Sequence, residues 1–116
     1  MSDLQGLQEK IAQFVADRDW SQFHNPKDLA ISLNLEASEV LEHFQWKSDH
    51  EMIDYVKTHK EEIGDELADV LYWVLLMANN MSIDVIAASE RKLLKNAKKY
   101  PVEKSKGNHK KYTELQ

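Results

Sequence analysis

The sequence contains no cysteine, which excludes a disulfide framework and a thiolate metal site. Glycine and proline are also scarce, with 3 and 2 residues among 116, and this composition favours a helical chain. No run approaches the roughly 20 apolar residues that a membrane-spanning helix needs. The first five residues lack the basic and then apolar pattern of a signal peptide, so we expect a cytoplasmic protein.

The charge is unevenly distributed along a chain whose formal net charge is −5. Between Glu36 and Asp69 there are eleven acidic residues and three lysines. Between Arg91 and Lys111 there are nine basic residues and one acidic residue. An acidic middle suits cations, whereas a basic end suits phosphates or serves solubility.

Hydrophobic periodicity and capping signals predict an all-α fold of four to five helices. Asn25-Pro26 predicts a helix start, and Ser48 with Glu51 matches a capping box. Pro101 should end the last helix. We expect one all-α domain over residues 1–100 and a basic C-terminal tail over residues 101–116. We expect helices over about residues 3–17, 26–46 and 60–79, a short helix after Ser48, and a last helix that Ser82 or Asp84 caps and that ends before Pro101.

Two acidic quartets stand out in the middle of the chain, Glu36-Ala-Ser-Glu39 and Glu66-Leu-Ala-Asp69. Each quartet places two carboxylates three residues apart, on one face of a helix. Apolar residues surround both pairs, and carboxylates on a buried side are costly unless something pairs with them. A divalent cation would balance these charges. The alternative is an acidic face exposed to solvent.

If the two helices are antiparallel, Glu36, Glu39, Glu66 and Asp69 converge into an all-oxygen site. Such a site selects Mg²⁺, Mn²⁺ or Ca²⁺ over Zn²⁺ or Cu²⁺. A di-iron bundle would need Glu-x-x-His pairs, and no histidine has a glutamate three residues before it. Glu62, one turn before Glu66, is a candidate for a second cation or for orienting a water.

The quartets, with 26 residues between Glu39 and Glu66, resemble the metal motif of the MazG-like, all-α NTP pyrophosphohydrolases. Five further stretches are similar to the dCTP pyrophosphatase branch of that family. They are residues 18–24, 39–47, 65–71, 99–101 and 111–115.

The resemblance implies a Mg²⁺-dependent enzyme, with Mn²⁺ as a possible substitute. It implies cleavage of a dNTP, dCTP or a related one, to dNMP and pyrophosphate in nucleotide-pool house-cleaning. It also implies a MazG-like helical subunit in a homotetramer, a dimer of dimers, with the active site formed across a subunit contact. No nucleic-acid polymer and no membrane is expected as a partner.

The resemblance also assigns roles to residues by motif position. It makes Glu36, Glu39, Glu66 and Asp69 the metal ligands and catalytic carboxylates. Trp20 and Trp46 become aromatics of the base pocket, and Asn96 becomes a polar contact to the nucleotide. Ile11 and Trp73 stand where a relative has histidine and tyrosine, and both could reshape the base pocket.

Several candidates keep two interpretations. His24 either contacts the base or caps the turn at Asn25. Lys99 and Lys111 either hold phosphates or lie on a solvated face. Trp73 is either a substrate contact or a packing residue.

Two other functions compete with dNTP cleavage. One is a pyrophosphohydrolase of the same fold that acts on another nucleotide, such as phosphoribosyl-ATP. The other is a non-catalytic helical module for oligomerisation or regulation, in which the acidic residues are surface.

Overall fold

Helix α4 (Lys60–Asn80) is the element against which the first part of the chain packs. A computed structural model describes residues 2–115, and these contain helices and no strand. The all-α prediction is confirmed. The chain divides into two compact units, Met1–Ser82 and Ile83–Gln116, each of which is described by itself. The proposed division at residue 100 stays a prediction about domain organisation.

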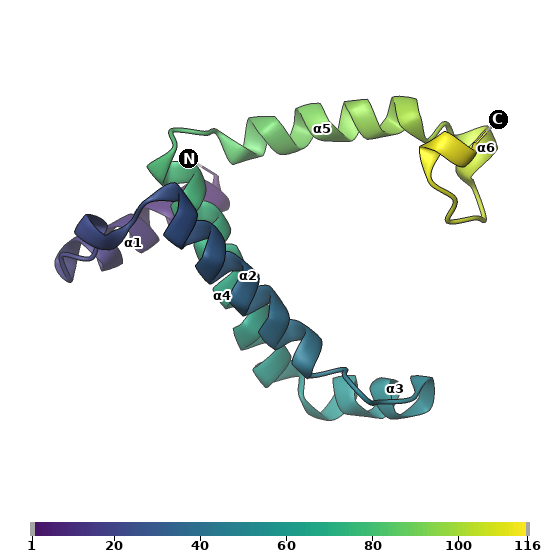
Figure 1. The fold of residues 1–116 in the computed structure, drawn as a ribbon, viewed down its shortest axis with the longest axis horizontal. Coiled ribbons are helices and arrows are strands. Elements are labelled where there is room, and N and C mark those ends of the chain that lie inside the picture. Colours follow the sequence, from purple (N-terminus) through teal and green to yellow (C-terminus); the bar gives the residue numbers. More distant parts are fainter. Residues whose placement is uncertain (1, 116) are drawn as a thin grey trace. The chain divides into compact units, whose positions relative to one another are not determined.

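In the first unit, α2 (Pro26–Glu42) runs antiparallel to α4 along much of its length (Figure 1). Helix α1 (Asp3–Asp17) also packs on α4. In the C-terminal half of α4, the Leu75 carbonyl accepts a hydrogen bond from Gln8 Nε2 at 3.1 Å. A 3₁₀ turn, η1 (Ser21–Phe23), and the short helix α3 (Asp49–Thr58) complete this unit. The buried apolar side chains are Ile11, Val15, Leu29, Leu75, Leu76 and Ala78.

Local capping explains most helix starts. The Asn25 side chain accepts from the Asp28 backbone N–H at 2.9 Å, with Pro26 in the first helical position. Ser48 and Glu51 form the predicted capping box of α3. Of the two candidate caps for the last long helix, Asp84 is the one that accepts a hydrogen bond, from the Ala87 N–H.

The predicted end of α2 is wrong. The helix ends at Glu42 rather than near Trp46, and residues 43–46 form turns. Backbone bonds there run from Phe44 and Gln45 back to the Leu41 carbonyl, and Trp46 adopts a left-handed φ of 70°. A left-handed residue cannot continue a right-handed helix, so the chain turns toward α3.

The second unit contains α5 (Val85–Lys99), the four-residue helix α6 (Val102–Ser105) and the 3₁₀ turn η2 (Tyr112–Glu114). Its last residues fold back on the end of α5. Tyr112 meets Tyr100 edge to face at 6.1 Å, and Lys99 Nζ lies 4.7 Å from the centre of the Tyr112 ring. The basic tail therefore has ordered contacts of its own.

Within residues 2–115, no single helix is both long and apolar enough to cross a membrane. Only α4 and α5 counted together would meet the requirements of length and composition.

Candidate active site

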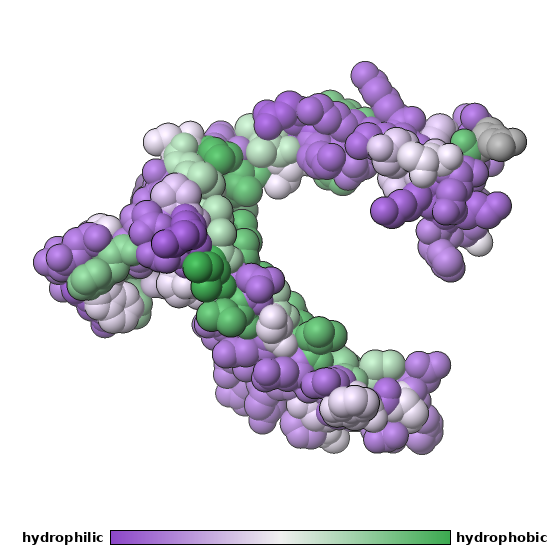
Figure 2. Space-filling model, viewed as in Figure 1, coloured by the Kyte–Doolittle hydropathy of each residue, from purple (hydrophilic) through white to green (hydrophobic). Residues whose placement is uncertain are grey.

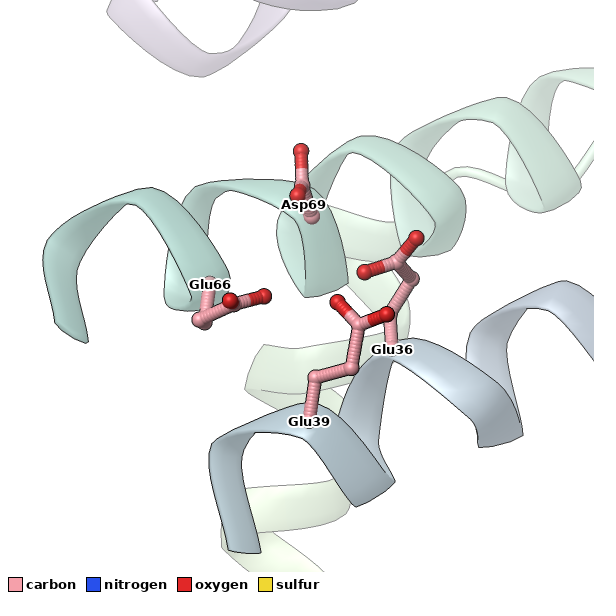
Figure 3. Close-up of side chains that lie close together, drawn as sticks. All are labelled: Glu36, Glu39, Glu66 and Asp69. Atoms are coloured by element: carbon pink, nitrogen blue, oxygen red, sulfur yellow. The ribbon is translucent and has the colours of Figure 1, made fainter. Parts of the chain in front are cut away.

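Four carboxylates from two helices converge in the first unit. Helix α2 supplies Glu36 and Glu39, and α4 supplies Glu66 and Asp69 (Figure 3). Each pair is spaced i, i+3, so its two side chains leave one face of the helix. The antiparallel packing of α2 on α4 brings the two faces together. One oxygen of each carboxylate lies within 4.8 Å of those of the other three.

Two carboxylates of the cluster have raised pKa values. Burial raises the pKa of Glu36 to about 7, and a hydrogen bond with Glu39 and repulsion from Glu39, Asp69 and Glu66 add to the shift. The pKa of Glu66 is raised by its hydrogen bond with Glu39, then by burial and by repulsion from Glu39, Asp69 and Glu42. Glu36 Oε2 is buried and finds no hydrogen-bond partner among the described residues.

These observations fit a divalent cation. Four carboxylates offer only oxygen ligands, and hard cations such as Mg²⁺, Mn²⁺ and Ca²⁺ prefer such sets. A cation would offset the repulsion within the cluster and give Glu36 Oε2 a partner. The predicted convergence of the two quartets therefore agrees with their placement, while their role as ligands stays a prediction.

An apolar cavity of about 490 Å³ adjoins the cluster. Glu36 and Asp69 belong to both, so a molecule in the cavity can reach the carboxylates. The other lining residues come from α1, the turn after it and α4. They are Lys10, Ile11, Phe14, Trp20, Tyr72 and Trp73.

Aromatic rings shape this cavity. Trp20 meets Phe14 edge to face at 5.8 Å, and Phe14 meets Tyr72 in the same way at 6.2 Å. The Arg18 guanidinium lies 3.7 Å from the centre of the Phe14 ring. Burial raises the pKa of Tyr72, and Arg18 partly opposes that shift. Such a cavity suits a flat, partly apolar group.

The predicted substrate residues of the first unit fall in three places. Trp20 and Trp73 line the cavity, as does Ile11. His24 is not among the described residues that line the cavity, and its ring meets that of Trp73 edge to face, with centroids 6.0 Å apart. Trp46 is 92% exposed and is not among the described residues that line the cavity.

The remaining predicted residues belong to the second unit. Asn96 is a partly buried residue of α5, Lys99 ends that helix, and Lys111 precedes η2. Lys99 contacts the Tyr112 ring within the unit. The roles of these three residues toward a nucleotide stay predictions.

The sequence analysis missed part of the site. Lys10 and Phe14 line the cavity, yet Phe14 fits the apolar stripe of an amphipathic helix and gave no separate signal. His43 and Tyr55 were missed as well. His43 lies beside Glu66 and Tyr55 is hydrogen-bonded to His43, an arrangement that only the packing of α2, α3 and α4 produces.

Comparisons with known proteins agree with this geometry. Residues 31–115 match the model of the MazG-like family. The chain is 39% identical to dCTP pyrophosphatase 1 of Rattus norvegicus and 35% identical to that of Homo sapiens. Both alignments cover 97% of this chain and 67% of the relative. A pyrophosphatase from Archaeoglobus fulgidus DSM 4304 superposes with a TM-score of 0.82 at 36% identity, over 87% of this chain and 94% of that one.

Proposed function

Because this chain belongs to the MazG-like family, we propose that it is a nucleoside triphosphate pyrophosphohydrolase of nucleotide-pool house-cleaning. The substrate is a dNTP, dCTP or a related nucleotide, and the products are dNMP and pyrophosphate. One observation carries the proposal. The carboxylate cluster on α2 and α4 opens directly into a cavity lined by aromatic residues, which suits a phosphate chain at one end and a base at the other.

A divalent metal is the expected cofactor, and we propose Mg²⁺, with Mn²⁺ able to replace it. Glu36, Glu39, Glu66 and Asp69 would hold it. When bound, it would neutralise triphosphate charge and polarise the attacked phosphorus. In its absence Glu36 holds a proton close to neutral pH, because burial and the neighbouring carboxylates raise its pKa to about 7. We propose that a carboxylate of this cluster accepts the proton of the attacking water.

The aromatic cavity would bind the base. Stacking of a base on an aromatic ring contributes about 1–3 kcal/mol and tolerates several bases. Trp20 and Trp73 line this cavity and would make this contact, and the His24 ring meets that of Trp73 edge to face. Ile11 contributes an apolar group where the resemblance places a histidine in a relative. The base preference of this protein therefore need not be limited to cytosine.

We further propose a cytoplasmic homotetramer, a dimer of dimers. Apolar side chains on α2 and α4 are exposed in the single chain, and a second subunit would bury them. Figure 2 shows apolar surface along these two helices. Subunit contact would also give Trp46, Asn96, Lys99 and Lys111 a route to a neighbouring site. The exposed side chains include Ile31, Leu35, Leu67 and Leu71, at 50%, 59%, 54% and 38%.

The decisive experiment is a panel of nucleotides with separate detection of pyrophosphate and orthophosphate, in the presence and absence of Mg²⁺. We expect pyrophosphate from dCTP or a related dNTP. Release from phosphoribosyl-ATP alone would identify the other enzyme of this fold. No release and no nucleotide binding would support the non-catalytic module.

The matched variants for this experiment are Glu39→Gln and Glu61→Gln. Glu39 belongs to the cluster, whereas Glu61 is an exposed residue at the start of α4. Only Glu39→Gln should abolish turnover. Full turnover by Glu39→Gln would contradict the assigned site.

A further inference from the structure

A short polar network connects α3 to the carboxylate cluster. His43 follows the last residue of α2, and its Nε2 lies 3.8 Å from Glu66 Oε1. Its Nδ1 is hydrogen-bonded to the Tyr55 hydroxyl on α3. Both members of the pair are largely covered, with side-chain exposures of 15% for His43 and 26% for Glu66. The network therefore begins at Tyr55 on α3, passes through His43 just after the end of α2, and ends on the Glu66 carboxylate of α4.

The Tyr55 ring is fixed from several sides. It stacks on the His59 ring, with centroids 4.0 Å apart and planes 8° from parallel. Lys47 Nζ lies 4.2 Å from its centre, and the Phe44 ring meets it edge to face at 6.2 Å. The hydroxyl consequently has a defined position toward His43.

The two partners of His43 together favour one position for its proton. A tyrosine hydroxyl can donate or accept, whereas the Glu66 carboxylate only accepts, so a neutral His43 carries its proton on Nε2 and accepts from the Tyr55 hydroxyl at Nδ1. A charged imidazole carries protons on both nitrogens and donates to the tyrosine oxygen instead. In both charge states an Nε2–H faces Glu66. The remaining tautomer would set a bare nitrogen against a carboxylate and is unfavourable.

We propose that His43 is a positioning residue for Glu66 and that Tyr55 orients His43. This inference rests on the proposed metal site. At 3.8 Å the contact is an electrostatic attraction rather than a hydrogen bond. It favours one orientation of the Glu66 carboxylate, opposes the repulsion from Glu39 and Asp69, and so prepares the cluster for a cation. Partners that orient metal ligands typically change metal affinity by about 10–100-fold.

The test is Mn²⁺ binding by the nucleotide-free full chain, followed by electron paramagnetic resonance. We expect His43→Leu to weaken the Mn²⁺ Kd by about 10-fold. Tyr55→Phe should weaken it in the same direction, because it removes only the hydroxyl. The double variant should bind no more weakly than His43→Leu, since Tyr55 acts through His43. His43→Gln keeps an N–H donor and should bind Mn²⁺ more tightly than His43→Leu.

Two controls separate the possible failures. His50 is an exposed histidine paired with Asp54 at 3.6 Å, and His50→Ala should leave the Kd unchanged. Glu66→Gln should strongly reduce Mn²⁺ binding. If Glu66→Gln has no effect, the proposed metal site itself is wrong, and the inference falls with it.

A different result would overturn the role of His43 and Tyr55 while leaving the proposed metal site in place. That result is strong loss of Mn²⁺ binding in Glu66→Gln, with His43→Leu and Tyr55→Phe both within twofold of the parent. Because Tyr55→Phe is isosteric, it keeps the test available even if His43→Leu does not fold. Turnover assays would support the inference further if His43→Leu and Tyr55→Phe needed a higher Mn²⁺ concentration than the parent for half-maximal turnover and reached the same maximal rate.

Discussion

Glu36 and Asp69, on two different helices, each line the aromatic cavity and each belong to the carboxylate cluster. A ligand in the cavity is therefore next to the proposed cation without any rearrangement of α2 or α4. The same placement leaves Glu36 Oε2 buried, with no partner among residues 2–115. Affinity for the cation and affinity for the nucleotide should consequently depend on the same pair of side chains.

Asp69→Asn should abolish most turnover. The substitution keeps the size of the side chain but removes a charged ligand, and loss of about 3 kcal/mol of metal stabilisation would slow the reaction by roughly 100-fold. Asp65→Asn, on the same helix at an exposed position, is the matched control. The measurement is pyrophosphate release at saturating Mg²⁺. Equal rates for the two variants would remove Asp69 from the site.

The metal-free protein should lose stability as the pH rises through the range set by Glu36. The pKa of Glu36 is about 7 in the folded chain and 4.5 for the unperturbed side chain. The folded state therefore binds more protons between these values, and the free energy of unfolding falls as the pH rises from about 4.5 to 7. Glu39, Glu66 and Asp69 produce the electrostatic part of the shift, and Lys10 lines the same cavity.

Thermal unfolding in a chelator at several pH values checks this prediction. The parent should lose stability relative to Glu36→Gln as the pH increases, because the glutamine cannot ionise. Saturating Mg²⁺ should reverse the trend, since cation binding displaces the proton. A parent and variant whose difference is constant from pH 4.5 to 8 would contradict the raised pKa.

Short-range signals in the sequence predicted much of the fold. The first helix begins and ends where expected, at Asp3 and Asp17, and the capping box at Ser48 forms as predicted. These features depend on residues three or four positions apart. The end of α2 was mispredicted because no glycine or proline stands there. The helix ends at Glu42 and is followed by turns over residues 43–46 with a left-handed Trp46, a conformation that the local sequence does not indicate.

The candidate site was likewise predictable only in part. The convergence of the quartets was predictable, because an i, i+3 pair fixes a helix face and only one antiparallel pairing was needed. The contact of His43 with Glu66 was not predictable. His43 lies just after the end of α2 and Glu66 lies on α4, so their contact depends on how these two segments pack. Lys10 likewise reaches the cavity only because α1 packs on α4. Tertiary contacts of this kind leave no periodic pattern.

Trp20→Ala should raise the KM for the nucleotide. Loss of a stacked ring costs about 1–3 kcal/mol, which corresponds to roughly 5–150-fold in binding. The maximal rate should change less, because Trp20 lines the cavity and is not a member of the cluster. Phe23→Ala is the control, since Phe23 is 65% exposed in the same segment and is not one of the described lining residues. Equal KM values for the two variants would argue against base stacking on Trp20.

Leu35→Asp should dissociate the oligomer. Leu35 is 59% exposed on α2, and a charge there would be buried by any subunit that covers this face. Asn34→Asp places the same charge on the adjacent, already polar position and should have no effect. Size-exclusion chromatography with light scattering measures the mass of each variant. A parent that is already monomeric would refute the proposed tetramer directly.

Trp46→Ala tests whether a subunit contact completes the site. The Trp46 side chain is 92% exposed, so its removal should change the free energy of unfolding by no more than about 0.5 kcal/mol. If Trp46 contacts the base in a neighbouring subunit, the variant should nevertheless raise the KM. Mixing Trp46→Ala subunits with inactive Glu39→Gln subunits should then create sites that contain both Trp46 and Glu39. We expect these mixed oligomers to recover activity above that of the Trp46→Ala variant at low substrate. Absence of recovery in confirmed mixed oligomers would place the action of Trp46 within its own subunit or outside the site altogether.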